Sequence, residues 1–89
     1  MNIRIEDWDG LSYKVGTLTN VSVTDMVALL GPANHGDDLD KVSHSWRFYV
    51  DDEPINVWDW KGSCFMDRWS FYGHPATIAK LFGEENVKV

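Results

Sequence analysis

The amino-acid sequence predicts an α+β domain, in which an antiparallel β-meander of three or more strands packs two short helices on one face. Two kinds of pattern support this prediction. Apolar and polar residues alternate in 43–50, 55–61 and 68–73, as they do in strands that bury one face. Two further segments, 24–31 and 74–83, combine helical apolar spacing with residue types that begin and end helices.

The chain is expected to form a single domain that spans residues 1–89. Eighty-nine residues lie near the lower end of the usual domain size, so the core must be dense in large side chains. Five tryptophans, four phenylalanines and three tyrosines meet that need. The sequence contains no repeat and no segment with the composition of a linker.

The N-terminal part reads as extended chain. Ile3 and Ile5 alternate with polar residues and predict a short strand. The segment 7–10, Asp-Trp-Asp-Gly, is typical of a turn, and 11–23 is expected to be extended, with Tyr13 and Val15 at a spacing of two.

Each predicted helix has recognisable ends. Thr24 is expected to cap a helix that begins at Asp25, and Gly31 is expected to end it. At the C-terminal helix, His74 or the residue before it is expected to cap, and Gly83 is expected to end the helix. Pro75 suits the first helical position of this helix.

The second half is expected to contain a hairpin whose four-residue turn is 51–54. Val50 would then face Ile55, and Arg47 would face Trp58. Side chains on one face would form the core, namely Trp46, Phe48, Val50, Ile55, Val57, Trp69 and Phe71. The opposite face would carry Arg47, Tyr49, Trp58, Trp60 and Tyr72.

Asp59 lies between two tryptophans and is expected on the core side of the sheet, where it needs a hydrogen-bond donor such as an indole N–H or a loop amide. A one-residue bulge near the strand end would instead turn Asp59 outward and Trp60 inward. The sequence leaves both arrangements open.

The outer aromatic residues have two interpretations. They either cover a second small core beneath the N-terminal segment or form a patch that is open to a protein partner. In the second case Arg47, Tyr49, Trp58 and Tyr72 are the predicted contact residues, with the Arg47 guanidinium stacked on Trp58.

Charge and composition exclude several classes of function. Fourteen acidic residues against eight Lys and Arg give a net charge of −6, which argues against direct binding to nucleic acid or to an anionic membrane. No apolar run approaches the length of a membrane span, and the first residues lack the apolar core of a signal peptide. With Cys64 as the only cysteine, we expect a cytoplasmic protein.

The acidic loops are a second candidate contact surface. Asp37, Asp38 and Asp40 lie in one polar loop, 51–53 holds three more acids, and a third cluster lies within 6–9. Such clusters, if arrayed along one surface, would imitate nucleic-acid phosphates and engage a basic groove on a partner.

Catalysis is not expected. A further alternative is a small enzyme that uses Cys64 with His74, its nearest histidine along the chain, but no motif supports this pair. His35 with Asp37, Asp38 and Asp40 matches no metal-site spacing, so we predict no metal, no cofactor and no catalytic residue. Stacking of single-stranded nucleic acid on the aromatic face is the least favoured alternative, because the charge balance denies it a cationic surround.

The segment "LGPANHGDDLDKVSHSWRFYVDDEPINVWDWKGS", followed by "RWSFYGH", resembles small uncharacterised proteins encoded by bacteriophages. The resemblance covers roughly residues 29–73 and departs at Trp58, where tyrosine is expected. It implies a bacterial cytoplasm and a partner that is a host or defence protein, which the chain binds and inhibits or modulates. A homodimer through the aromatic face is an alternative.

Overall fold

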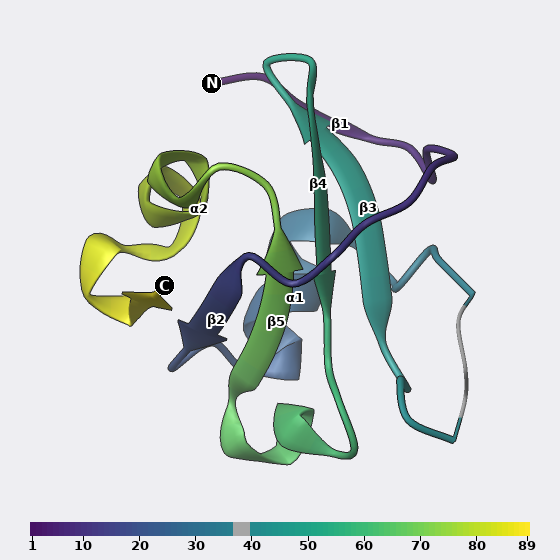
Figure 1. The fold of residues 1–89 in the computed structure, drawn as a ribbon, viewed down its shortest axis with the longest axis vertical. Helices are drawn as coiled ribbons and strands as arrows, with labels where there is room; N and C mark the ends of the chain where they lie inside the picture. The colour runs from purple at the N-terminus through teal and green to yellow at the C-terminus, as the bar shows by residue number, and fades with distance from the viewer. Residues whose placement is uncertain (37–39) are drawn as a thin grey trace.

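The computed structural model describes residues 1–36 and 40–89 and has the predicted α+β class. Figure 1 shows a twisted sheet with helix α1 behind it and helix α2 beside its upper part. The elements are β1 (Ile3–Ile5), β2 (Gly16–Thr19), α1 (Val23–Leu30), β3 (Ser45–Val50), β4 (Glu53–Trp58), the 3-10 turn η1 (Ser63–Met66), β5 (Arg68–Tyr72), α2 (Pro75–Phe82), the 3-10 turn η2 (Glu84–Asn86) and β6 (Val87–Lys88).

The six strands form one antiparallel sheet in the order β1-β3-β4-β5-β2-β6. β3, β4 and β5 are neighbours in chain order, but the sheet as a whole is not a meander. β1 pairs with β3, whereas β2 pairs with β5 on the other side of the sheet. The chain between β1 and β2 therefore has to cross the front of the sheet, as Figure 1 shows.

The β3–β4 turn has two residues rather than the predicted four. Val50 pairs with Glu53, so only Asp51 and Asp52 lie in the turn, with φ of 49° and 68°. Positive φ at both positions is the geometry of the tight turn that matches strand twist, and Asp tolerates it. The predicted facing of Val50 with Ile55 is wrong by two positions. Because side chains alternate with a period of two, this shift leaves every residue on its predicted face.

The inner face forms the predicted core. Its side chains are at most 3% exposed, namely Trp46, Phe48, Val50, Ile55, Val57, Trp69 and Phe71. Both helices add to the same cluster, Met26 and Leu30 from α1 and Ile78 from α2. The buried indoles retain partners, since Trp46 Nε1 donates to the Gly31 carbonyl at 2.8 Å and Trp69 Nε1 to the Val21 carbonyl at 2.7 Å. Burial therefore leaves neither N–H unpaired.

The helix ends agree with the sequence in one case and correct it in the other. α2 is capped by His74, begins at Pro75 and ends at Gly83, as predicted. α1 begins earlier than predicted, because its cap is Ser22 and not Thr24. The Ser22 side chain accepts from the Asp25 N–H, and the Asp25 carboxylate accepts from the Ser22 N–H, which is a complete capping box.

No helix in the described residues is long and apolar enough to cross a membrane.

Gly16, in β2, is packed closely against the backbone of β6 and the Phe71 ring. A Cβ at this position would lie 2.5 Å from the Lys88 carbonyl oxygen and 2.8 Å from the Phe71 ring. Gly16→Ala is therefore expected to lower the free energy of unfolding by about 1–3 kcal/mol, measured by urea denaturation. The control is Gly36→Ala, where a Cβ meets no atom of residues 1–36 and 40–89 within 4 Å. Equal midpoints for the two variants would contradict the close approach of β6 to β2.

Candidate functional site

Asp59 follows the last residue of β4 and points to the core side, where it has no exposed surface. The sequence analysis expected either an indole N–H or a loop amide as its hydrogen-bond donor, and the structure shows loop amides. Oδ1 accepts the Ser43 N–H at 2.9 Å and the His44 N–H at 2.8 Å, and Oδ2 accepts the Ser43 hydroxyl. The Asp59 N–H donates to the His44 carbonyl at 3.1 Å. Asp59 thus fastens the chain before β3 to the chain after β4.

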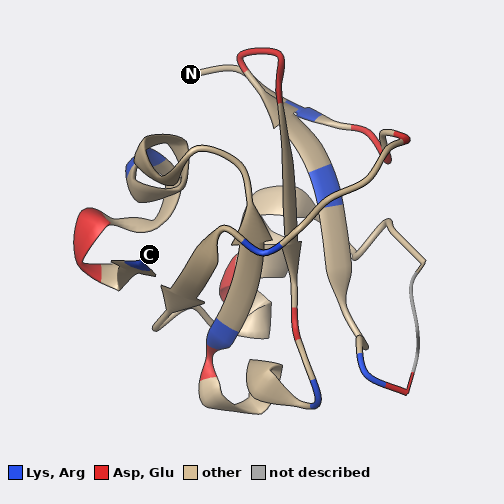
Figure 2. Cartoon of the chain, viewed as in Figure 1, with Lys and Arg blue, Asp and Glu red and all other residues tan. Residues whose placement is uncertain are grey.

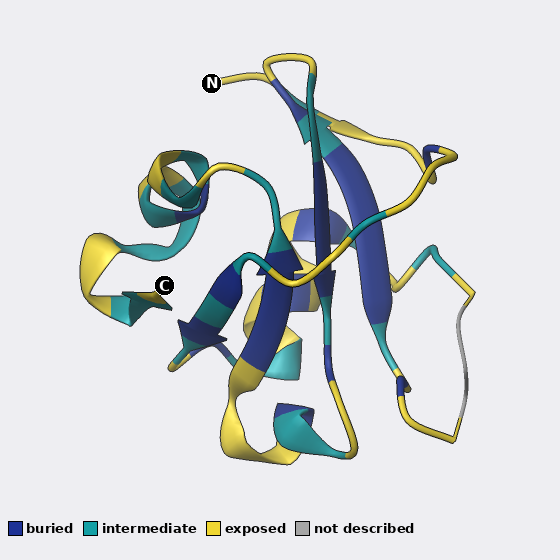
Figure 3. Ribbon diagram, in the orientation of Figure 1, coloured by how far each residue is buried: buried dark blue, intermediate teal, exposed yellow. Residues whose placement is uncertain are grey.

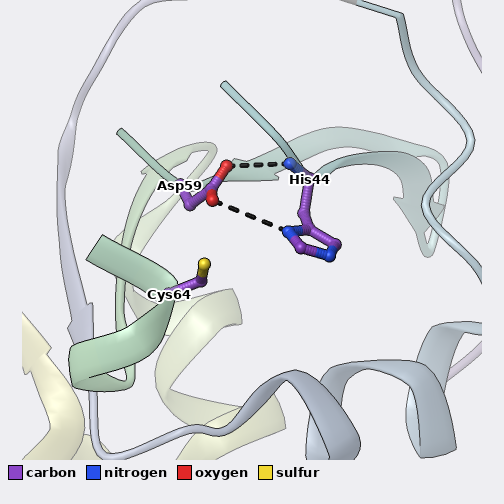
Figure 4. Close-up of side chains that lie close together, drawn as sticks. All are labelled: His44, Asp59 and Cys64. Carbon is purple, nitrogen blue, oxygen red and sulfur yellow. Dashed lines mark hydrogen bonds and ion pairs between the residues drawn. The ribbon is translucent and has the colours of Figure 1, made fainter. Parts of the chain in front are cut away.

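His44 and Cys64 complete the cluster around this carboxylate (Figure 4). Cys64, in η1, is 3% exposed, and its sulfur lies within 4.8 Å of a ligand atom of Asp59 and of His44. His44 Nδ1 lies 3.6 Å from Asp59 Oδ2, and the His44 ring stacks on Trp46 with an interplanar angle of 12°. The three residues come from separate segments, which the fold brings together.

The environment sets the charge of the two buried groups. Burial by itself would raise the pKa of Asp59, but hydrogen bonds from the Ser43 hydroxyl, the His44 and Ser43 amides and the Cys64 thiol hold that pKa below its usual range. Burial, followed by the hydrogen bond and charge of Asp59, raises the pKa of the Cys64 thiol. Asp59 is therefore an anion near neutral pH, and Cys64 is a protonated thiol.

This geometry gives no support to nucleophilic catalysis by Cys64. A catalytic cysteine needs an accessible sulfur and a lowered pKa, and Cys64 has neither. The structure gives no support to the alternative that paired Cys64 with His74, because His74 is the expected cap of α2, where its ring accepts the Ala76 N–H. The histidine beside the thiol is His44, which the sequence analysis missed because it lies twenty positions earlier in the chain.

His44, Asp59 and Cys64 are also the one group of potential metal ligands that the structure shows among residues 1–36 and 40–89. One ligand atom from each residue lies within 4.8 Å of the others. The structure does not test the possible metal ligands considered from the sequence, His35 with Asp37, Asp38 and Asp40, because Asp37 and Asp38 lie outside the described residues. His35 Nδ1 is 2.7 Å from Asp7 Oδ1.

The outer face of the sheet carries a second small core under the N-terminal segment. Arg47 is only 7% exposed, its guanidinium carbon lies 4.1 Å from the centre of the Trp8 ring, and its Nη1 donates to the Trp8 and Gly10 carbonyls. The predicted stacking of Arg47 on Trp58 is wrong. The strand register sets Asn56, not Trp58, opposite Arg47. The ring that lies against the guanidinium is that of Trp8, which belongs to the crossing segment between β1 and β2, residues 6–15. Arg47 therefore presents almost no surface to a partner.

The other predicted aromatic contacts are half-buried. Arg4 lies over the Tyr49 ring at 4.3 Å, and the Tyr72 ring contacts the rings of Trp8 and Tyr13. Trp58 lies beyond this cover, in a groove of about 320 Å³ that is lined by Lys14, Trp58, Trp60 and Ser70. The segment between β1 and β2 thus divides the predicted aromatic set: Trp58 lines this groove, and Tyr72 lines a separate groove with Tyr13 and Pro54.

The β4–β5 loop, residues 59–67, carries three exposed apolar side chains, one of which, Trp60, lines this groove. Figure 3 shows exposed backbone on both sides of η1 in this loop. Trp60 is 47% exposed, Phe65 90% and Met66 69%. The Lys41 and Lys61 ammonium groups lie 5.8 and 5.9 Å from the centre of the Trp60 ring. The sequence analysis missed Phe65 and Met66, although an apolar pair inside a short loop between Gly62 and Asp67 was a visible signal.

Three groups of acidic residues lie away from this loop, whereas Asp59 and Asp67 belong to it. Figure 2 shows the three groups at the β3–β4 turn, in the segment after β1 and around η2. Asp51 and Asp52 are exposed, and Arg4 bridges Asp52 and Glu6 at 3.2 and 3.5 Å. Asp40 is exposed at the end of its loop.

No protein-family model, no curated protein and no solved structure matches the chain. The resemblance to small bacteriophage proteins therefore remains a prediction.

Asp59→Asn is expected to lower the free energy of unfolding by about 1–3 kcal/mol near neutral pH, because an amide would turn a donor toward groups that now donate to the carboxylate. The difference in free energy of unfolding between wild type and this variant should shrink as the pH falls below 3.8, the ordinary pKa of an aspartate. The folded-state pKa of Asp59 is lower than that value, so the folded protein loses the stabilising charge when Asp59 is protonated. Urea denaturation at a series of pH values measures both effects. Exposed Asp67→Asn is the control, and a pH-independent difference would contradict the assignment.

Proposed function

We propose that the protein is a non-catalytic binding domain that contacts another protein through the β4–β5 loop. The observation that carries this proposal is the exposure of Trp60, Phe65 and Met66 within seven residues of one loop. Aromatic and methionine side chains are enriched at the centres of protein interfaces, where their burial supplies most of the binding energy. The expected partner is a bacterial host or defence protein, which rests only on the sequence resemblance.

The loop is well suited to binding because its base is fixed. Cys64 and Asp59 are buried beneath it, and Lys61 N–H donates to the Lys41 carbonyl at 2.6 Å. The Asp67 N–H closes η1 by donating to the Cys64 carbonyl at 3.1 Å. A contact surface that is ordered before binding loses less conformational entropy when the complex forms.

The charges around the loop indicate the chemistry of the partner. Four of the eight Lys and Arg side chains lie at or beside Trp60, namely Lys14, Lys41, Lys61 and Arg68. In a chain with a net charge of −6, half of the Lys and Arg side chains are thus concentrated here, where Asp40 and Asp67 are the exposed acids next to them in the chain. The complementary surface is an apolar pocket with an acidic rim.

The acidic end supports a second candidate, the imitation of nucleic acid. β1 pairs with β3, so the acids of the β3–β4 turn and those that follow β1 lie at one end of the sheet (Figure 2). This surface would engage a basic groove, and the replacement of Asp51 and Asp52 by Asn would weaken it. Asn tolerates the positive φ of both positions, so these substitutions change charge without disturbing the turn.

Immobilised protein, incubated with bacterial lysate, tests the two surfaces. The double variant Phe65→Ala/Met66→Ala is expected to bind its partner at least ~30-fold more weakly, since a loss of about 2 kcal/mol or more is typical of central interface residues. The folded state should tolerate both changes, because both side chains are exposed.

The matched control is Leu11→Ala, which removes an apolar side chain that is 95% exposed outside the loop. Unchanged capture by the Phe65/Met66 variant would contradict the proposal. Loss of partner capture in the Asp51→Asn/Asp52→Asn variant alone would favour the acidic surface instead. The homodimer alternative placed the contact on the aromatic face. Sedimentation of the wild-type chain shows whether it self-associates, and sedimentation of the Phe65/Met66 variant shows whether any such contact uses the loop.

A further inference from the structure

We propose that His44, Asp59 and Cys64 form a binding site for one divalent transition-metal ion of the zinc type. This inference is independent of the proposed protein contact, because it concerns the buried base of the loop and not its exposed residues.

The donor set is the first argument. A histidine nitrogen, a carboxylate oxygen and a cysteine sulfur are the three ligand types that proteins use for zinc. His44 precedes β3, Asp59 follows β4 and Cys64 lies in η1, so a bound ion would join three segments. Magnesium and calcium prefer oxygen ligands and do not suit this set.

The distances are the second argument. Two ligand atoms on one tetrahedral zinc, each about 2.0–2.3 Å from the ion, lie roughly 3.3–3.7 Å apart. His44 Nδ1 and Asp59 Oδ2 already have this separation, at 3.6 Å. All three ligand atoms lie within 4.8 Å of one another, so a movement of about 1 Å in the Cys64 and His44 side chains closes the site.

The groups behind the ligands are the third argument. Asp59 Oδ1 accepts two backbone N–H groups, from Ser43 and His44, which orient the carboxylate with Oδ2 toward the histidine. The Ser43 hydroxyl now donates to Oδ2, and its Oγ lies 3.1 Å from His44 Nδ1, so this hydroxyl would have to turn away when an ion binds. Outer hydrogen bonds of this kind fix ligand orientation in metal sites. Trp46 stacks on the His44 ring and limits its rotation.

The site has a route to solvent and a balanced charge. The His44 side chain is 35% exposed, whereas the Asp59 side chain is fully buried, so an ion would enter past the imidazole, and a water molecule would occupy its fourth position. When the metal–sulfur bond forms, the Cys64 S–H bond breaks and the proton passes to water. The thiolate and the carboxylate then match the two charges of the ion, and neutral His44 binds through Nδ1.

Cobalt(II) titration of the purified full chain tests the proposal. We expect one equivalent to bind with a thiolate-to-cobalt charge-transfer absorption in the near ultraviolet and with the intense visible bands of a tetrahedral site. Zinc should displace the cobalt. Cys64→Ser should abolish the charge-transfer absorption, and His44→Gln should weaken binding at least ~100-fold, because each removes a ligand of the ion. Circular dichroism confirms that each variant is folded.

The matched control is His35→Ala, which removes a partly buried histidine outside the cluster and should leave cobalt binding unchanged. The proposal is overturned if wild-type protein shows no charge-transfer absorption at millimolar cobalt. It is equally overturned if folded Cys64→Ser binds as tightly as wild type. Partner capture by the Phe65/Met66 variant does not depend on either outcome, so the two proposals fail separately.

Discussion

The buried carboxylate of Asp59 is the interaction on which the end of the protein that carries the β4–β5 loop depends. An anion without solvent contact must be hydrogen-bonded, and here the Ser43 and His44 amides and the Ser43 hydroxyl supply the donors, while the Cys64 sulfur lies close by. A single side chain thereby joins the approach to β3, the end of β4 and the turn η1. The β4–β5 loop is held at its base, while Trp60, Phe65 and Met66 remain exposed.

The position of Asp59 depends in turn on the β3–β4 turn at the far end of the hairpin. A two-residue turn at Asp51 and Asp52 sets Val50 opposite Glu53, and the same register, continued along both strands, sets His44 opposite Asp59. The predicted four-residue turn would have set Trp46 there. The choice of turn therefore decides which residues meet at the candidate site.

The sequence predicted the faces of the sheet, the core and the ends of α2, because these depend on alternation and on local end signals. The sequence could also have predicted Ser22 as the cap of α1, since Ser22 and Asp25 form a capping box at the standard spacing. The sequence did not predict which aromatic ring contacts the Arg47 guanidinium. It depends on the path of the chain between β1 and β2, which crosses the sheet and places Trp8 over the guanidinium. The meeting of His44 with Cys64 likewise needs the register and the fold of η1, which no local pattern specifies.

Amide hydrogen exchange in wild type and Asp59→Asn tests most directly whether this carboxylate holds the loop. The account predicts that protection at the Lys61, Phe65 and Asp67 amides, which are hydrogen-bonded within or to the loop, falls at least ~10-fold more than protection in the centre of the sheet. Equal changes in the loop and in the centre of the sheet, or no change in the loop, would contradict it.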